Sequence, residues 1–234
     1  MNLFYSEYID VSDEEIIFFD QENRHLTSVL RKNIGDSVSV TNGRGFIFNC
    51  ILTEINKNKS VLKVVDYTKS INNSPKLKIA ISLTKKSDRF EWFLEKATEI
   101  GISEITPIIA QNSVRTRLNH LRAKKILVTA MKQSLRDVLP TLNSPIKLSS
   151  YLDSIDSSLD SFIATCLIDD IDLLSNRLTK GNNSQILIGP EGGFTQNELD
   201  LAKKANFTPV SLGDSRLRTE TAGVVSCSIF SIIN

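Results

Sequence analysis

The last quarter of the chain contains two successive strand–turn–helix patterns, and they restrict the possible folds more than any other feature. An apolar run at 185–188 leads into the turn Gly189–Gly193, which holds three glycines, a proline and a carboxylate. A second apolar run at 209–212 leads into a turn at 213–218 and then an apolar helix at 221–233. Glycine allows a backbone to approach a ligand without a Cβ clash. The two turns predict a small-molecule site built mainly from main-chain groups, with a plain β–α turn as the alternative for each.

The same alternation of strands and helices extends back to residue 77, and it predicts an α/β domain with a mostly parallel sheet covered by helices. The predicted strands are 77–83, 105–109, 162–168, 185–188 and 209–212. The predicted helices are one from Asp88 to Gly101, a long basic helix from Leu118 to Leu135, one at 198–205 and one at 221–233. The residues expected to cap these helices are Asp88 with Glu91, Thr195 with Glu198, Gly101 at a carboxyl end, and Thr219 or Thr221.

The first 70 residues have a different pattern, which is typical of a small β-barrel or sandwich. Alternating or apolar runs at 36–41, 46–52 and 61–65 predict three strands, and Asn42-Gly43 between the first two is a strong hairpin signal. Leu26, Val29 and Leu30 have helical spacing, so one short helix is expected at 23–31. The polar stretch at 68–75 predicts the domain boundary.

Other sequence features exclude several classes of protein. No signal peptide and no membrane-spanning run is recognisable, which predicts a soluble cytoplasmic protein. Cys50, Cys166 and Cys227 are far apart and lack metal-ligand spacing, so no metal site is expected and all three are predicted to be buried as small apolar residues. No Ser–His–Asp order or carboxylate pair stands out.

Charge is distributed unevenly, although the formal net charge is only +1. Residues 71–150 contain 14 basic and 6 acidic residues, whereas residues 151–234 contain 6 basic and 11 acidic ones. The segment Gln111–Arg136 contains seven basic residues and no acidic one. This asymmetry favours binding of a polyanion, and the alternative is a solvated helix face. Arg216, Arg218 and Glu220, taken alone, are equally typical of surface ion pairs.

Several motifs in the chain resemble the ribosomal RNA small subunit methyltransferase E family, of the SPOUT superfamily. The strongest are Gly189–Phe194, Leu212-Gly213 and Leu217–Ala222. The resemblance continues, in order, through the rest of the chain at His25-Leu26, Val29–Arg31, Gly35-Asp36, Lys86, Asp88–Phe90, Lys96–Glu99, Ser113-Val114, Gln133-Ser134 and Arg136.

This resemblance implies an S-adenosylmethionine-dependent enzyme that methylates N3 of a uridine in 16S ribosomal RNA of the small ribosomal subunit. It implies an RNA-binding PUA-like β-barrel at 1–70 and a SPOUT methyltransferase domain with a deep trefoil knot at 74–234. The resemblance also implies a homodimer, with the cofactor site near the subunit interface. A non-catalytic RNA-binding assembly factor, or a methyltransferase acting on another RNA, are the competing interpretations.

The resemblance also implies roles for individual residues. Arg218 would stabilise charge on the base or anchor a phosphate, and Glu220 would orient Arg218 or accept a proton; both are candidate catalytic residues. The candidate cofactor-binding residues are Leu167, Gly189, Pro190, Glu191, Gly192, Gly193, Leu212, Gly213, Leu217 and Arg218, with Cys166 as a further wall residue. The candidate RNA-binding residues are Arg24, Arg31, Arg115, Arg117, Arg122, Lys124, Lys125, Lys132 and Arg136.

The chain departs from the family pattern at one point. Family members commonly have Pro-Arg-Ile-Leu-Arg after the Leu-Gly pair, whereas this chain has Asp214–Arg218 there. Ser215 replaces the first arginine of that pattern, and Arg216 stands at the usual isoleucine. Leu217 and Arg218 still match, so the resemblance leaves only the orientation of Arg216 open.

Overall fold

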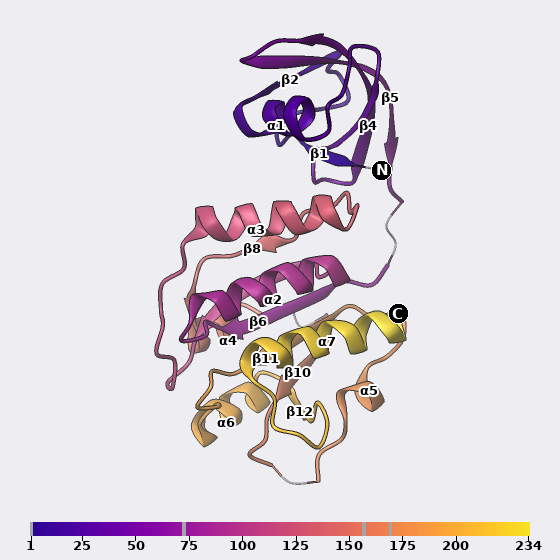
Figure 1. Ribbon diagram of the computed structural model, residues 1–234. Coiled ribbons are helices and arrows are strands. Elements are labelled where there is room, and N and C mark those ends of the chain that lie inside the picture. Colours follow the sequence, from indigo (N-terminus) through magenta and orange to yellow (C-terminus); the bar gives the residue numbers. More distant parts are fainter. Residues whose placement is uncertain (1, 72–73, 156–157, 169) are drawn as a thin grey trace. The chain divides into compact units, whose positions relative to one another are not determined.

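The computed structural model describes residues 2–71, 74–155, 158–168 and 170–234. They form two compact units (Figure 1). The first unit comprises Met1–Asn72 together with Met131–Leu139, and the second comprises Asn73–Ala130 and Pro140–Asn234. The first unit is therefore built from two separate segments of the chain.

The core of the first unit is a five-stranded sheet with the order β1-β3-β4-β5-β2. Its strands are β1 (Leu3–Tyr5), β2 (Glu15–Phe19), β3 (Ser37–Thr41), β4 (Phe46–Ile55) and β5 (Lys59–Lys69). β3, β4 and β5 form an antiparallel meander, in the order expected from the runs at 36–41, 46–52 and 61–65. Alternate side chains of these strands, among them Val40, Phe48 and Leu62, are buried in one apolar cluster.

The short helix expected at 23–31 has a different geometry. An α-helix, α1 (Asp20–Arg24), continues into one turn of π-helix, η1 (His25–Val29). Leu26 is fully buried, whereas Val29, which α-helical spacing would place on the same face, is 65% exposed. The physical reason is the wider π-helical turn, which changes the face occupied by a residue three positions along.

The segment Met131–Leu139 belongs to the first unit because of main-chain hydrogen bonds to the β3–β4 hairpin. The amide of Gly45 donates to the carbonyl of Asp137 over 2.9 Å, and the amide of Leu139 donates to the carbonyl of Gly43 over 2.8 Å. The Thr41 hydroxyl also donates to the carbonyl of Asp137, over 3.1 Å. These bonds satisfy polar groups at the end of the hairpin.

The second unit is built on a sheet with the strand order β12-β10-β11-β6-β7-β8, in which β9 also pairs with β7. All recorded pairs in this sheet are parallel, as the alternating pattern predicted. The strands are β6 (Leu77–Ser82), β7 (Glu104–Ile109), β8 (Thr141–Leu142), β9 (Ile146–Lys147), β10 (Asp160–Ala164), β11 (Ser184–Ile188) and β12 (Thr208–Val210). The helices are α2 (Ser87–Ile100), α3 (His120–Gln133, whose last three residues count with the first unit), α4 (Leu148–Asp153), α5 (Leu174–Arg177), α6 (Gln196–Lys204) and α7 (Thr219–Ile233).

Helices cover both faces of this sheet. α2 and α7 pack side by side (Figure 1). The Gly223 backbone of α7 lies against the ring of Phe93 in α2. α4 and α6 bury Leu148 and Leu199 in a separate cluster with Ala80 of β6. Gly101 ends α2 with a φ of 113°, which confirms the predicted cap. Thr195 and Glu198 form the predicted capping box at the start of α6.

Two other helix predictions are wrong. α2 begins at Ser87 after Lys86, without a side-chain cap, because Asp88 accepts from the amide of Arg89 and Glu91 pairs with Arg122 instead. The apolar pattern of the basic helix predicts that Leu121, Leu127 and Met131 are all buried; Leu127 and Met131 are, but Leu121 is 79% exposed. No helix among the described residues has both the length and the apolar character to cross a membrane.

Candidate functional site

A cavity of about 580 Å³ lies at the carboxyl ends of β10, β11 and β12 in the second unit. Ligands of open α/β sheets bind at this edge, and the volume is typical of a small-molecule site. Three loops form the walls, and each directly follows one of these strands. The loop residues lining the cavity are Thr165–Leu167, Gly189–Phe194, Ser211–Gly213 and Ser215–Arg218.

Hydrogen bonds within the unit fix the shape of these loops. The amide of Gly193 donates to the carbonyl of Pro190 over 2.8 Å and closes a tight turn. The Asn112 amide group donates to the carbonyl of Gly193 over 3.1 Å. One oxygen of Glu191 accepts from the amide of Lys85 over 2.8 Å. The Glu191 carboxylate therefore anchors its loop to the segment after β6.

Glycine is required at two positions of the site. A Cβ on Gly189 would lie 3.1 Å from two ring carbons of Phe194, which is 4% exposed and has little room to move. Gly213 has a φ of 128°, in the left-handed region that L side chains rarely adopt. A Cβ there would meet nothing within 4 Å, so its backbone conformation explains the residue.

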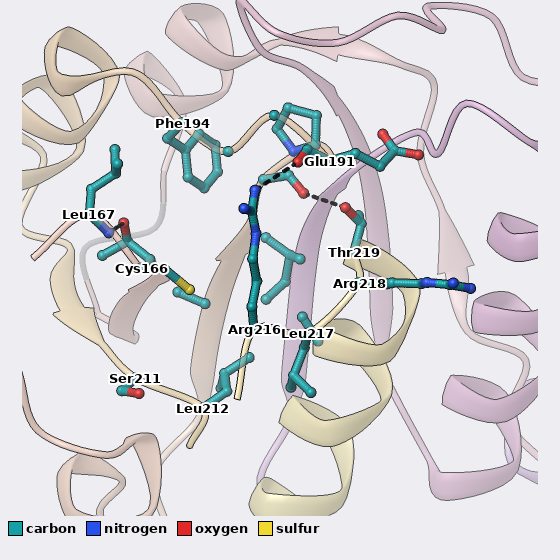
Figure 2. A pocket seen from close by; sticks show the side chains of 18 of the residues that line it. Cys166, Leu167, Glu191, Phe194, Ser211, Leu212, Arg216, Leu217, Arg218 and Thr219 are labelled. Carbon is teal, nitrogen blue, oxygen red and sulfur yellow. Dashed lines mark hydrogen bonds between the residues drawn. The ribbon is translucent and has the colours of Figure 1, made fainter. Parts of the chain in front are cut away.

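The two arginines after β12 point in different directions (Figure 2). Arg216 extends among the other cavity residues, and its Nη2 donates to the carbonyl of Glu191 over 3.4 Å. Arg218 extends to the opposite side, away from Cys166 and Leu212. The structure thus gives Arg216, at the position where the chain departs from the family pattern, a place inside the cavity.

The start of α7 corrects the predicted cap. The residue preceding the helix is Arg218, and it makes no side-chain cap. The Thr219 hydroxyl donates instead to the carbonyl of Gly189 over 2.9 Å, which ties α7 to the glycine turn (Figure 2). Glu220 is buried in the first turn, with Oε1 at 3.6 Å from Nε of Arg89.

All ten candidate cofactor residues line this one cavity, as does Cys166. Cys50 and Cys227 are buried, as predicted, but Cys166 is exposed, so the prediction for that residue is wrong. It lies just beyond the end of β10, where the cavity opens beside it. Sequence reasoning missed the cavity residues Ser211 and Phe194 as site residues in their own right, although both flank the glycine-containing turns.

The nine candidate RNA-binding residues divide between the two units. Arg122 is exposed and forms a two-pronged pair with Glu91, at 2.6 and 2.7 Å. Nε of Arg115 donates to the carbonyl of Arg117 over 3.1 Å. The residues in the second unit are Arg115, Arg117, Arg122, Lys124 and Lys125; those in the first unit are Arg24, Arg31, Lys132 and Arg136. The charge cluster seen in the sequence is thus partly compensated by acidic residues outside Gln111–Arg136.

Lys132 is the clearest case of such compensation. Its Nζ lies 2.6 Å from Oε1 of Glu22, both side chains are largely buried at 16% and 23% exposure, and Nζ also lies 5.9 Å from the centre of the Phe4 ring. Lys132→Met is expected to lower the free energy of unfolding by about 1–3 kcal/mol, because it leaves the Glu22 carboxylate without its partner. Urea denaturation measures this. The control Lys125→Met, at an exposed position of the same helix, is expected to change stability by less than about 0.5 kcal/mol; equal effects would contradict the prediction.

No cluster of three or more His, Cys, Asp or Glu side chains suited to a metal ion occurs in the described part of the chain.

Comparison with known proteins bears on both units. Residues 72–231 match the family described as RNA methyltransferase domain, and residues 13–65 match the RNA methyltransferase PUA domain. The chain is 30% identical over 225 residues to "Ribosomal RNA small subunit methyltransferase E" of Bacillus subtilis, covering 90% of this chain and 87% of that protein. The chain belongs to the ribosomal RNA small subunit methyltransferase E family.

Two solved structures show the same fold as this member of the methyltransferase E family. A probable rRNA-methyltransferase from Porphyromonas gingivalis is 35% identical, with a TM-score of 0.93, over 100% of this chain and 98% of that one. A ribosomal RNA small subunit methyltransferase E from Neisseria gonorrhoeae, solved bound to S-adenosyl methionine, is 26% identical. Its TM-score is 0.87, over 97% of this chain and 95% of that one.

Proposed function

We propose that this chain is an S-adenosylmethionine-dependent methyltransferase that modifies N3 of a uridine in 16S ribosomal RNA. The observation that carries the proposal is the cavity of about 580 Å³ at the carboxyl ends of β10, β11 and β12. The chain has the fold of the Neisseria gonorrhoeae protein solved with S-adenosyl methionine. Relatives that match nearly the whole chain are named for ribosomal RNA methylation.

The residues of the cavity suit this cofactor. Apolar side chains, among them Leu167, Ile188 and Leu212, can enclose an adenosine group, while the glycine turn and Leu212-Gly213 expose main-chain donors and acceptors. Gly193 and Gly213 have no neighbouring atom within 4 Å of the position that a Cβ would occupy, so a ligand can approach their backbone. We propose that the ten residues named above bind S-adenosylmethionine, which supplies an electrophilic methyl group when bound.

Arg218 and Glu220 are proposed to act on the uridine. Methylation at N3 requires loss of the N3 proton, and the negative charge that develops then lies on the ring and its carbonyl oxygens. The Arg218 guanidinium would stabilise that charge or anchor a neighbouring phosphate, and the Glu220 carboxylate would orient Arg218 or accept the proton. Arg218 lines the cofactor cavity, which supports a role for it close to the bound cofactor.

The remaining parts of the proposal concern assembly and RNA. The deep trefoil knot is proposed from membership of the methyltransferase E family and from the likeness to solved rRNA methyltransferase structures. A homodimer is supported by α7, which is apolar on several sides and leaves Ile232 83% exposed. A cytoplasmic location is proposed because the relatives are named for methylation of ribosomal RNA. Of the nine basic residues named above, Lys132 is held in its pair with Glu22. The other eight, with the PUA domain, would contact RNA phosphates.

The decisive experiment is transfer of labelled methyl groups from S-adenosylmethionine to small ribosomal subunits that lack the modification, with the product nucleoside identified by mass. 3-Methyluridine at a single site is the expected product. Cofactor binding without methyl transfer would indicate that another RNA is the substrate. Absence of cofactor binding would favour a non-catalytic RNA-binding role.

Cys166 provides a test of cofactor placement that needs no turnover. Burial raises the pKa of the Cys50 thiol to about 12 and also raises that of Cys227, so neither forms the reactive thiolate at neutral pH. Iodoacetamide is expected to label Cys166 alone, and saturating S-adenosylmethionine is expected to slow this labelling about fivefold or more by covering the cavity. Peptide mass spectrometry with time measures both. Equal labelling rates with and without the cofactor would place the cofactor elsewhere.

Gly213 tests whether the loop conformation matters for binding. Gly213→Ala is expected to weaken S-adenosylmethionine binding about tenfold, because the left-handed backbone strains any L residue and shifts the cavity wall. Gly181→Ala is the matched control: Gly181 also has a left-handed φ, of 89°, and open space around its Cβ position, but does not line the cavity. Calorimetry should find normal affinity in the control. Equal affinity in both variants would show that Gly213 is dispensable for the site.

A further inference from the structure

A second cavity, of about 390 Å³, adjoins the cofactor cavity in the same unit. Two helices form it, α2 on one side and the start of α7 on the other. Arg218 lines both cavities, so the second one begins where the cofactor site ends. Its lining residues are Asp88, Arg89, Trp92, Arg218, Glu220 and Thr221. We call it the α2–α7 cavity.

One carboxylate oxygen in this cavity lacks a hydrogen-bond partner among the described residues. The Glu220 side chain is only 7% exposed, and its Oε1 lies 3.6 Å from Nε of Arg89. Its Oε2 is buried, and no hydrogen-bond donor reaches it from the described residues. A buried acceptor left unsatisfied is costly, and most such groups in native proteins have a partner. An N–H group of a ligand entering the cavity would supply the missing donor after a small rotation of the carboxylate.

The polar groups of the cavity match one edge of one nucleobase. Glu220 presents an acceptor, while Arg89 and Arg218 present guanidinium donors. The Watson–Crick edge of uracil has the complementary set, because the N3–H donor lies between the acceptors O2 and O4. Cytosine has an acceptor at N3 and a donor amino group at C4, so its N3 lone pair would face the carboxylate. A site that leaves polar groups unpaired rejects the wrong ligand strongly.

Trp92 provides an aromatic surface in the same cavity. Its side chain is 42% exposed although it lies on a helix of the core, so part of the indole is accessible to a ligand. Single-stranded bases flipped out of a stack are commonly held against aromatic side chains. Trp92 is also the only tryptophan of the chain, so intrinsic tryptophan fluorescence reports on this cavity alone.

We propose that the α2–α7 cavity is the subsite for the target nucleobase, in which Trp92 stacks on the ring and Glu220, with Arg89 and Arg218, selects uracil over cytosine. Arg89 would donate to the base and also hold the Glu220 carboxylate in place. The inference rests on the proposed function and adds to it the part of the chain that recognises the base.

The test is a fluorescence titration of the full chain with uridine 5′-monophosphate and, separately, cytidine 5′-monophosphate. Saturable quenching of Trp92 is expected, with the uridine nucleotide binding about fivefold more tightly or better. Glu220→Gln is expected to reduce this preference to less than about twofold, because the amide can present either a donor or an acceptor. Glu95→Gln, which removes a half-exposed carboxylate from α2, the helix that carries Trp92, is the control and should keep the preference.

Equal quenching by the two nucleotides, or no saturable quenching, would overturn the subsite. Trp92→Leu provides a second test: the KM for RNA is expected to rise about five- to tenfold through lost stacking. Its affinity for S-adenosylmethionine should not change, since Trp92 does not line the cofactor cavity. An unchanged KM for RNA with active enzyme would overturn the subsite and leave the proposed function intact. Absence of cofactor binding in the unmodified chain would contradict the proposed function itself.

Discussion

Replacing Glu220 by glutamine is expected to lower the rate of methyl transfer by about two to four orders of magnitude. Glutamine has the same shape, so α7 should begin as before, but an amide cannot accept the N3 proton. The buried position of Glu220 beside Arg89 also leaves little room for water to substitute for the carboxylate. Single-turnover kinetics with saturating cofactor and RNA measure the chemical step directly.

The control for Glu220→Gln is the affinity for S-adenosylmethionine, measured on the same sample by calorimetry. It should stay within about twofold of the unmodified chain, because Glu220 lines the α2–α7 cavity and not the cofactor cavity. A rate that stays within a factor of about three of the original would remove Glu220 from the acid–base chemistry. Arg218 would then be left as the candidate catalytic group.

Gly223→Val is expected to cause the largest loss of stability, about 2–3 kcal/mol. A Cβ at this position would lie 2.5 Å from Cε2 of Phe93 and 3.0 Å from Cδ1 of Ile81. Both side chains are fully buried, so neither can move aside without disturbing the core. The helix propensity gained by removing glycine, below about 1 kcal/mol, is too small to compensate.

Urea denaturation of Gly223→Val measures this loss. Ser231→Val is the matched control, since it introduces the same β-branched side chain on an exposed position of α7. It should change stability by less than about 0.5 kcal/mol. Similar stability of the two variants would mean that α7 does not pack against Phe93 as described.

The sheet of the second unit was predictable from the sequence because its signals are local and strong. The main strands of this sheet coincide with apolar runs that end at turns. The Thr195 capping box and the Gly101 cap each depend on residues within one helical turn. The short elements β8, β9, α4 and α5 were not predicted, because two to six residues are too few for a periodic pattern.

The failed cap predictions have a different cause, which is competition from residues far away in the sequence. Thr219 is a good capping residue, but its hydroxyl bonds to the carbonyl of Gly189, thirty positions earlier. Glu91 could have capped α2, but Arg122 offers a stronger, charged partner. Such pairings exist only after the sheet has brought distant segments together.

The candidate site was likewise predictable where its signals are local and unpredictable where distant segments meet. The glycine-containing turns indicated a ligand site, and their residues do gather in one cavity. The α2–α7 cavity was not predicted, because Arg89 and Trp92 are separated from Glu220 by about 130 residues, and the Asp88–Phe90 motif does not indicate which distant residues it will face. Only the packing of α2 against α7 makes them neighbours.

The two-segment composition of the first unit has a consequence for synthesis. Its β3–β4 hairpin is complete only when Asp137 and Leu139 have bonded to Gly45 and Gly43. On a translating ribosome these residues emerge well after Asn72, by roughly 3 to 13 seconds at ordinary elongation rates. Throughout that interval, water or a chaperone must satisfy the Gly45 amide and the Gly43 carbonyl at the end of the hairpin. A fragment that ends at residue 72 would lack these bonds permanently and is expected to aggregate.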